Sequence, residues 1–334
     1  MFFRILVLMS RSFSPKLPRL KLLWITDPWT TLDHLQDTTL RLALEGLNLG
    51  IPSYWSASDF LLSGGDSRLA AVSLTTDFIQ TFKPESVDQR QFFSPSEFHH
   101  LHYRIDPPVD FNYISLIEEL LKKGAKETQI MNPPALIARQ SEKVPPDSLL
   151  HLAPLHRVVR SHQEAKDAFP VLRSHAEFVS KPLNLAQSRG VKKWSTPKTE
   201  AEFVKILETE TQGFGEPIFV EEYLPGVMDG EVRMWFANGE FIAALKKHPK
   251  SGDFRVLIDE GSKVEPYFLN ADEEKAAKDV GQTLKAQGAA FAAIDFISGK
   301  ISDYNITSPG LLRQLEAVHG NKNFARVILE KLYG

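Results

Sequence analysis

The sequence predicts an α/β unit with an open sheet, followed by a longer α+β region, within one chain of 334 residues. Between about residues 21 and 132, apolar runs of strand length alternate with segments of helical period, which is typical of an open α/β sheet. Beyond the Pro145-Pro146 break, strand-like segments joined by turns dominate, which indicates α+β structure. With 43% hydrophobic residues, the chain can bury the cores of two or three structural units in one compact body.

The first unit is expected to open with a strand at 21–28, which ends at Asp27-Pro28. A helical period follows within 30–50 and is closed by Gly50. The remaining elements expected here are strands at 68–74, 99–105 and 128–132, and a helix at 112–124. We therefore place the end of this unit at about Asn132.

The α+β region is expected to begin with a helical segment at 133–143. Asn238-Gly239, between two apolar runs, is the strongest hairpin signal in the chain. The other elements expected in this region are strands at 177–183, 217–224, 231–247 and 292–305, and helices at 199–209 and 272–287.

Composition excludes several classes of function. A formal net charge of -3 and no stripe of Lys and Arg interleaved with aromatic residues argue against a nucleic-acid partner. The absence of cysteine excludes disulfides, zinc-thiolate sites and a cysteine nucleophile, and is compatible with a reducing compartment. We expect a cytoplasmic protein without a membrane partner.

Residues 1–20, "MFFRILVLMSRSFSPKLPRL", contain an apolar run that is shorter than a membrane span and is broken by Arg4. No small-residue cleavage pattern follows the run. We interpret this segment as a disordered extension. A mis-assigned start codon, with Met9 inside the run, and a weak secretory signal are the alternatives.

The segment 292–310, "AAIDFISGKISDYNITSPG", places Asp295, Asp303 and Asn305 where strands usually avoid such residues. A three-residue loop at 298–300 would pair Ile297 with Ile301 and set the two aspartates opposite each other, with the asparagine on the same face. A two-residue loop would shift the register by one and send the second aspartate to the opposite face.

Opposed carboxylates repel unless a cation lies between them, and the all-oxygen set suits Mg²⁺. The alternative is an exposed strand face with solvated acids. Other weak signals are Lys143, Lys181 at a strand end before Pro182, the acidic strand end 219–225, and two arginines that could bind phosphate or carboxylate, Arg233 and Arg255. Each of them is compatible with an ordinary solvated side chain.

Taken together and in order, these pieces resemble the prokaryotic glutathione synthetases of the ATP-grasp superfamily, over about residues 21 to 325. The resemblance implies an ATP-grasp fold at 133–334, with a central and a C-terminal part, preceded by the α/β domain at 21–132. The matching segments are "YRIDPPVD" (103–110), "NPPALIARQSEK" (132–143), "FVSKPL" (178–183), "EEYLPGVMDGEVR" (221–233) and "AAIDFISGKISDYNITSPGLLRQLE" (292–316).

The resemblance also implies roles for individual residues. Those for ATP are Lys143 and Lys181 at the phosphates, Glu221, Glu222, Tyr223 and Leu224 at the adenine hinge, and Glu231 at the ribose. The others are Arg233 at the transferring phosphate and acyl-phosphate oxygens, Asp295, Asp303 and Asn305 at magnesium, and Arg104, Arg255 and Ser308 at the substrates.

The chain departs from the family pattern at three places. The loop after Lys181-Pro182 reads "LNLAQSRGV", with Gly190 as its one glycine, so Arg189 is a candidate substitute for the usual backbone donors. The substrate loop within 246–266 has lost most of the family's glycines. Asp303 stands where the family has a glutamate, and is one methylene shorter.

The resemblance implies an ATP-dependent carboxylate-amine ligase that uses ATP and Mg²⁺, or Mn²⁺ in its place. A substrate carboxylate would be activated as an acyl phosphate and attacked by an amine, as with γ-glutamylcysteine and glycine in the family. The alternatives are a ligase for another peptide or amino acid, and a degenerate nucleotide-binding protein without turnover. The family's tendency to assemble favours a homo-oligomer.

Overall fold

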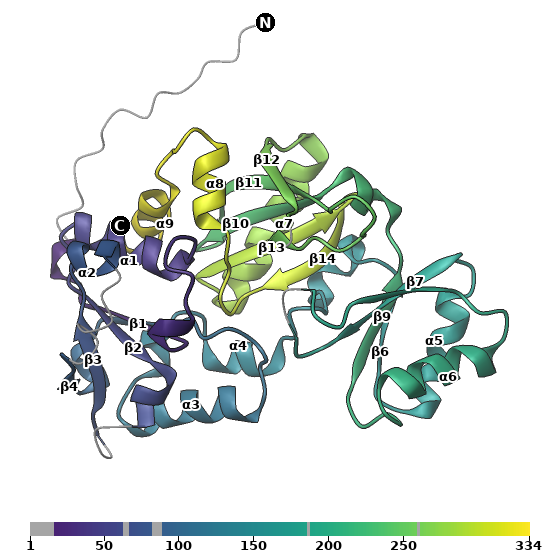
Figure 1. Ribbon diagram of the computed structural model, residues 1–334, viewed down its shortest axis with the longest axis horizontal. Helices are drawn as coiled ribbons and strands as arrows, with labels where there is room; N and C mark the ends of the chain where they lie inside the picture. The colour runs from purple at the N-terminus through teal and green to yellow at the C-terminus, as the bar shows by residue number, and fades with distance from the viewer. Residues whose placement is uncertain (1–16, 63–66, 82–88, 186–187, 259–260) are drawn as a thin grey trace, which may run out of the picture.

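The structure is a computed structural model that describes residues 17–62, 67–81, 89–185, 188–258 and 261–334. Residues 1–16 of the expected extension lie outside the described residues, and Leu17 is buried. Figure 1 shows three sheets: the N-terminal sheet at the left, the C-terminal sheet in the middle and the central sheet at the right. No helix in the described ranges is long and apolar enough to cross a membrane.

The N-terminal sheet has the strand order β4-β3-β2-β1-β5. The first strand, β1, pairs in parallel with β2 and β5, whereas β3 pairs antiparallel with β2 and β4, so the predicted open α/β unit is present. The strands are β1 (Leu22–Thr26), β2 (Ser53–Ala57), β3 (Leu69–Ser73), β4 (Gln91–Phe93) and β5 (His100–Tyr103). The helices are α1 (Thr38–Asn48), α2 (Thr76–Thr81) and α3 (Phe111–Lys122).

The structure narrows one expectation for this unit and contradicts another. The helix expected within 30–50 begins only at Thr38, because the Asp37 side chain caps its first turn by accepting from the Leu40 backbone N–H. The segment 128–132 is not a strand. It forms a single parallel bridge, Leu101 to Ile130, and the chain then turns away at Asn132, whose φ is 59°.

After α4 (Pro134–Arg139), the central part forms an antiparallel sheet in the order β6-β9-β7-β8. One core cluster buries both helices of this part against the sheet. The sequence pattern predicts β7, β9 and α6, but it does not reveal β6, β8 or α5. Their bounds are β6 (His156–Val159), α5 (His162–Leu172), β7 (Glu177–Pro182), β8 (Lys192–Ser195), α6 (Glu200–Glu210) and β9 (Ile218–Glu222).

The C-terminal sheet is antiparallel, in the order β12-β11-β10-β13-β14. Helix α7 packs on one face of this sheet. The other face shares a hydrophobic core with α8, α9 and the N-terminal sheet. In that core, Trp235 and Phe291 of the C-terminal sheet belong to the same cluster as Trp24 and Trp55 of the N-terminal sheet. The elements are β10 (Glu231–Ala237), β11 (Glu240–His248), β12 (Lys263–Tyr267), α7 (Ala271–Gln287), β13 (Phe291–Ile297), β14 (Lys300–Asn305), α8 (Leu312–Val318) and α9 (Phe324–Tyr333).

The β10–β11 hairpin turns at Asn238 and Gly239 as predicted, with φ of 50° and 76°. Positive φ at both central residues is the requirement of the two-residue type I′ turn. Gly239 also approaches α7 closely, since a Cβ there would lie 2.6 Å from the Gly281 carbonyl oxygen.

The register of the β13–β14 hairpin differs from the expectation next to the loop, but the two aspartates still pair with each other. The loop has two residues, Ser298 and Gly299, both with positive φ, so Ile297 pairs with Lys300 rather than with Ile301. Ser302 is an extra residue in β14 that forms a bulge and restores the register. As a result, the two predicted pairs, Asp295 with Asp303 and Ala293 with Asn305, are present.

Candidate functional site

A cavity of about 1030 Å³ lies where the three parts of the chain meet. Every site residue predicted from the sequence lines it except Glu222. Those that line it are Arg104, Lys143, Lys181, Arg189, Glu221, Tyr223, Leu224, Glu231, Arg233, Arg255, Asp295, Asp303, Asn305 and Ser308. A cavity of about 750 Å³ elsewhere, between β11 and α7, contains none of them.

Two cations hold Asp295 on the cavity wall. Arg233 donates to both of its carboxylate oxygens, at 2.8 and 2.6 Å, and Lys247 Nζ lies 3.1 Å from Oδ1. Burial acts to raise the pKa of Asp295, but Arg233 and Lys247 outweigh it and hold this pKa well below its usual range. Asp295 is therefore a carboxylate that is fully charged at neutral pH.

Lys247 was not identified from the sequence. Its Nζ lies 2.7 Å from Glu231 Oε2, and only 5% of the residue is exposed. Counting back from the Asn238-Gly239 turn would pair Glu231 with Lys246, the wrong lysine. A register shift between Trp235 and Phe236 moves the pairing by one residue, and no sequence signal marks that shift.

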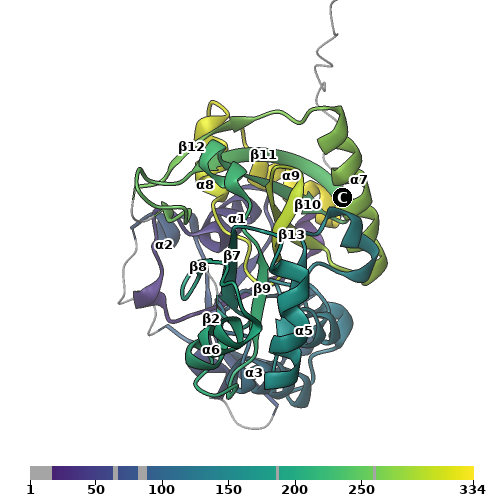
Figure 2. The same ribbon diagram turned by 90° about the vertical axis from the view of Figure 1, so that its right-hand side faces the viewer.

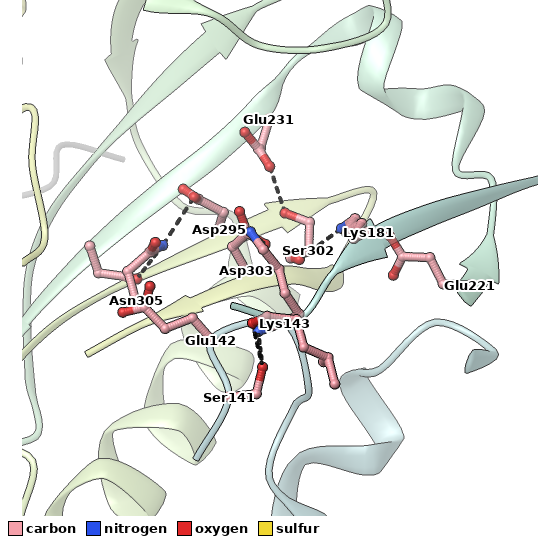
Figure 3. Close-up of polar contacts among 12 residues, drawn as sticks. Ser141, Glu142, Lys143, Lys181, Glu221, Glu231, Asp295, Ser302, Asp303 and Asn305 are labelled. Atoms are coloured by element: carbon pink, nitrogen blue, oxygen red, sulfur yellow. Dashed lines mark hydrogen bonds and ion pairs between the residues drawn. The ribbon is translucent and has the colours of Figure 1, made fainter. Parts of the chain in front are cut away.

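Lys143 and Asn305 each contact one of the two aspartates that face each other on the hairpin (Figure 3). Lys143 Nζ donates to Asp303 Oδ1 at 2.9 Å, and Asn305 Nδ2 donates to Asp295 Oδ2 at 3.2 Å. Each facing aspartate is thus neutralised by a cation from another element, which removes most of the repulsion between them.

Lys181 and Glu221 form a buried ion pair between neighbouring strands β7 and β9, with Nζ 2.6 Å from Oε1. Burial acts to lower the pKa of Lys181, yet Glu221 raises it above its usual range, while burial raises the pKa of Glu221. Lys181 also donates to the Ser302 carbonyl, at 3.1 Å. The second oxygen, Glu221 Oε2, is buried without a hydrogen-bond partner among the described residues.

The four predicted hinge residues do not all face the cavity. Successive strand residues point to opposite faces, so Glu222 points away from the neighbouring Glu221. Glu222 accepts from the Leu155 backbone N–H at 2.8 Å and lies 3.4 Å from His175 Nδ1. The side chain of Tyr223 packs edge-on against Phe254, which lies in the segment expected to be the substrate loop.

Two of the three predicted substrate residues, Arg104 and Ser308, lie at the end of the cavity nearest the N-terminal domain. Arg104 is buried and donates to Thr39 Oγ1 and to the Pro309 carbonyl, both at 2.8 Å. Ser308 Oγ donates to Asp106 Oδ1 at 2.7 Å. The third residue of the expected set, Arg255, forms an ion pair with its near neighbour Asp253 at 2.8 Å.

The chemistry of the donor set fits a hard divalent cation. Asp295, Asp303 and Asn305 offer two carboxylates and one amide oxygen, without a thiol or imidazole. Within the described ranges, no three His, Cys, Asp or Glu side chains are grouped to hold a metal ion. Coordination here therefore depends on the asparagine, or on further oxygens from a ligand.

The family comparison covers most of the chain. Residues 20–137 match the model described as "Prokaryotic glutathione synthetase, N-terminal domain", and residues 142–320 match "Prokaryotic glutathione synthetase, ATP-grasp domain". Curated relatives named glutathione synthetase include that of Prochlorococcus marinus subsp. pastoris, 28% identical over 322 residues, with 94% of this chain and 99% of the relative covered. That of Agrobacterium fabrum is 27% identical over 304 residues, covering 86% and 91%.

Solved structures agree at the level of the fold. The D-cycloserine synthetase DcsG has a TM-score of 0.63 and 15% identity, with 92% of this chain and 99% of that chain covered. The VanG D-Ala:D-Ser ligase from Enterococcus faecalis has a TM-score of 0.59 and 15% identity, with 93% and 98% covered. Together with the family matches, they confirm the resemblance inferred from the sequence. The chain belongs to the prokaryotic glutathione synthetase family and has an ATP-grasp fold preceded by an N-terminal domain.

Proposed function

We propose that this ATP-dependent carboxylate-amine ligase acts as a glutathione synthetase, which joins γ-glutamylcysteine to glycine. The observation that carries the proposal is the array of buried cations and acids on one cavity wall. Lys143, Arg233 and Lys247 each hold a carboxylate there, and Lys181 is paired beside them. Such an array suits a polyanionic ligand that binds together with divalent cations.

In the proposed reaction, a substrate carboxylate oxygen attacks the γ-phosphorus of ATP, and ADP leaves as an acyl phosphate forms. The neutral amine then attacks the acyl carbon, phosphate leaves, and the nitrogen gives up one proton as the amide forms. Lys143 and Lys181 would hold ATP phosphates, and Arg233 would stabilise the negative charge that develops on the transferred group. Magnesium, held by Asp295, Asp303 and Asn305, would supply further charge neutralisation at the phosphates.

The ion pairs of the cavity wall link nucleotide binding to metal binding in this proposal. Asp295 pairs with Arg233 and Lys247, and Asp303 pairs with Lys143. A triphosphate would compete for these cations, and the aspartates would then be able to hold magnesium instead. We therefore propose that nucleotide and metal bind with mutual reinforcement.

A second candidate is a ligase for a different peptide or amino acid. Both arginines expected to bind substrate carboxylates have protein partners: Arg104 donates to Thr39 and Pro309, and Arg255 pairs with Asp253. Arginines committed in this way have fewer donors left for a substrate carboxylate. This observation favours a substrate that differs from γ-glutamylcysteine.

The test is ADP release from ATP and Mg²⁺ with γ-glutamylcysteine and glycine, together with detection of glutathione. Mixtures that lack one substrate serve as controls, and a panel of other amino acids and dipeptides replaces each substrate in turn. Glutathione formation supports the leading proposal, and turnover only with other substrates supports the second candidate. A protein that binds ATP without turnover on any substrate of the panel contradicts both.

A further inference from the structure

Glu142 joins two segments of the cavity wall that lie far apart in the sequence (Figure 3). Its Oε1 accepts three hydrogen bonds, from Ile306 N at 2.8 Å, Thr307 N at 2.9 Å and Thr307 Oγ1 at 2.8 Å. Its backbone carbonyl accepts a fourth, from Tyr304 N at 2.7 Å. The chain on either side of Glu142 is thereby fastened to the end of β14.

The charge of Glu142 matters for these contacts. Burial raises the pKa of its carboxyl group, and the Thr307 hydrogen bonds oppose this shift because they favour the charged form. Hydrogen bonds to a charged acceptor are roughly twice as strong as those between neutral groups. A neutral amide at this position would keep the shape and weaken all three contacts.

The fastened segment carries the substrate end of the cavity. Ser308 follows Thr307 directly and donates to Asp106 of the N-terminal domain, at 2.7 Å. The next carbonyl, that of Pro309, accepts from Arg104 at 2.8 Å. A shift of 306–309 would therefore move the groups that face the substrate.

The nucleotide end has separate supports. Lys143 is held by Asp303 at 2.9 Å, and its backbone N–H donates to Ser141 Oγ at 3.2 Å. Lys181 is held by Glu221 and by the Ser302 carbonyl. None of these contacts passes through the Glu142 carboxylate.

We propose that Glu142 is a positioning residue that fixes segment 306–309, and thereby sets the affinity for the carboxylate substrate but not for the nucleotide. The proposal deepens the proposed function and rests on it for the identity of the substrate. It differs from a general structural role, because loss of Glu142 would then act on one end of the cavity alone.

The test compares Glu142→Gln, Thr307→Val and the double variant with the unmodified protein. Glu273→Gln is the matched control, since Glu273 accepts two hydrogen bonds, from Asn270 N and Tyr267 Oη, away from the cavity. The measurements are KM for γ-glutamylcysteine, the Kd of Mg²⁺-ADP, and hydrogen exchange at the Ile306 and Thr307 amides. The last two need no turnover.

We expect Glu142→Gln to raise KM by about tenfold, the scale of one hydrogen bond to a charged group. Thr307→Val should raise it less, because it removes one of three donors. In the double variant, KM should rise by less than the product of the two single increases, because both variants weaken the same contact. The Kd of Mg²⁺-ADP should stay within about twofold of the unmodified protein in all variants. Amide exchange at 306 and 307 should become faster in Glu142→Gln and stay unchanged in the control.

An unchanged KM in Glu142→Gln overturns the proposal, as does an equal loss of substrate and nucleotide affinity. If the unmodified protein shows no turnover with γ-glutamylcysteine, the proposed function fails, while amide exchange still decides the inference. Faster exchange with unchanged Mg²⁺-ADP affinity then supports the positioning role, and unchanged exchange refutes it.

Discussion

Lys181 Nζ lies 2.6 Å from Glu221 Oε1, and each side chain of this pair is at least nine-tenths buried. The two residues come from neighbouring strands, β7 and β9. Removing one partner of a buried ion pair leaves an uncompensated charge, at a cost of about 3–5 kcal/mol. Any test of Lys181 as an ATP ligand must therefore separate ligand binding from stability.

We predict that Lys181→Met destabilises the protein by about 3–5 kcal/mol, because Glu221 is left buried and unpaired. Adding Glu221→Gln should recover most of that loss by removing the orphaned charge. The rise in Tm with ATP and Mg²⁺, expected for the unmodified protein, should be largely absent from both variants. Urea unfolding and thermal shift measure the two effects separately. Recovery of the ATP shift in the double variant would exclude Lys181 from the nucleotide site.

Arg189 lines the cavity from within the loop that has Gly190 as its one glycine. If its guanidinium replaces backbone donors, Arg189→Ala should weaken ATP binding by roughly 1.5–3 kcal/mol, the scale of a hydrogen bond to a charged group. Lys192→Ala is the control, since Lys192 pairs with Glu210 and does not line the cavity. Titration calorimetry with ATP compares them, and equal affinities would refute the compensating role.

Much of the fold could be predicted from the sequence, because its elements carry local signals. Asn238-Gly239 marks a tight hairpin, and the apolar periods of α3 and α7 are long enough to locate both helices within two residues. The strand expected at 128–132 failed because one apolar residue, Ile130, forms a bridge without a continuing ladder. Tertiary context decides such short segments.

The pairing of Asp295 with Asp303 was predicted correctly, although the three-residue loop on which the prediction rested is wrong. Ser302 adds one residue to β14, which offsets the missing loop residue and returns Asp303 to the face of Asp295. A similar irregularity explains why Lys247 was not identified as a site residue, because the β10–β11 register shifts by one residue and pairs it with Glu231. Bulges depend on packing and ladder geometry, so local sequence patterns do not reveal them.

The pH dependence of stability should depend on Asp295. Its pKa is lowered in the folded protein by Arg233 and Lys247, against the opposing effect of burial. Its contribution to stability is therefore fully present above the unfolded pKa of about 3.9, and is lost as pH falls toward the lower folded pKa. Asp295→Asn removes this contribution and should lower the free energy of unfolding at neutral pH.

The stability difference between the unmodified protein and Asp295→Asn should be constant above about pH 5 and should shrink as pH falls to about 3. Urea unfolding at a series of pH values measures it. A difference that stays constant across this range would mean that Asp295 does not have the lowered pKa assigned to it.

Asp303 offers the clearest test of the metal site, because its own side chain is 23% exposed, whereas its partner Lys143 is buried, at 5%. Asp303→Asn leaves the buried Lys143 ammonium with an amide oxygen in place of the carboxylate, so urea unfolding is measured first to show that the variant is folded. The variant keeps the size of the side chain and loses its charge. Asp303→Glu keeps the charge and has the longer side chain that the family resemblance leads us to expect here.

We predict that Asp303→Asn abolishes the Mg²⁺ dependence of ATP affinity, because one carboxylate is left to hold the metal, while Asp303→Glu preserves or strengthens it. ATP affinity measured against magnesium concentration compares both variants with the unmodified protein. Asp279→Asn is the control, since Asp279 pairs with His151 and does not line the cavity. If all four curves superimpose, Asp303 is not a metal ligand and its pairing with Lys143 is its main interaction. Separation of the Asn curve alone assigns the metal to this hairpin, since the control loses a charge of the same sign and the Glu variant retains one.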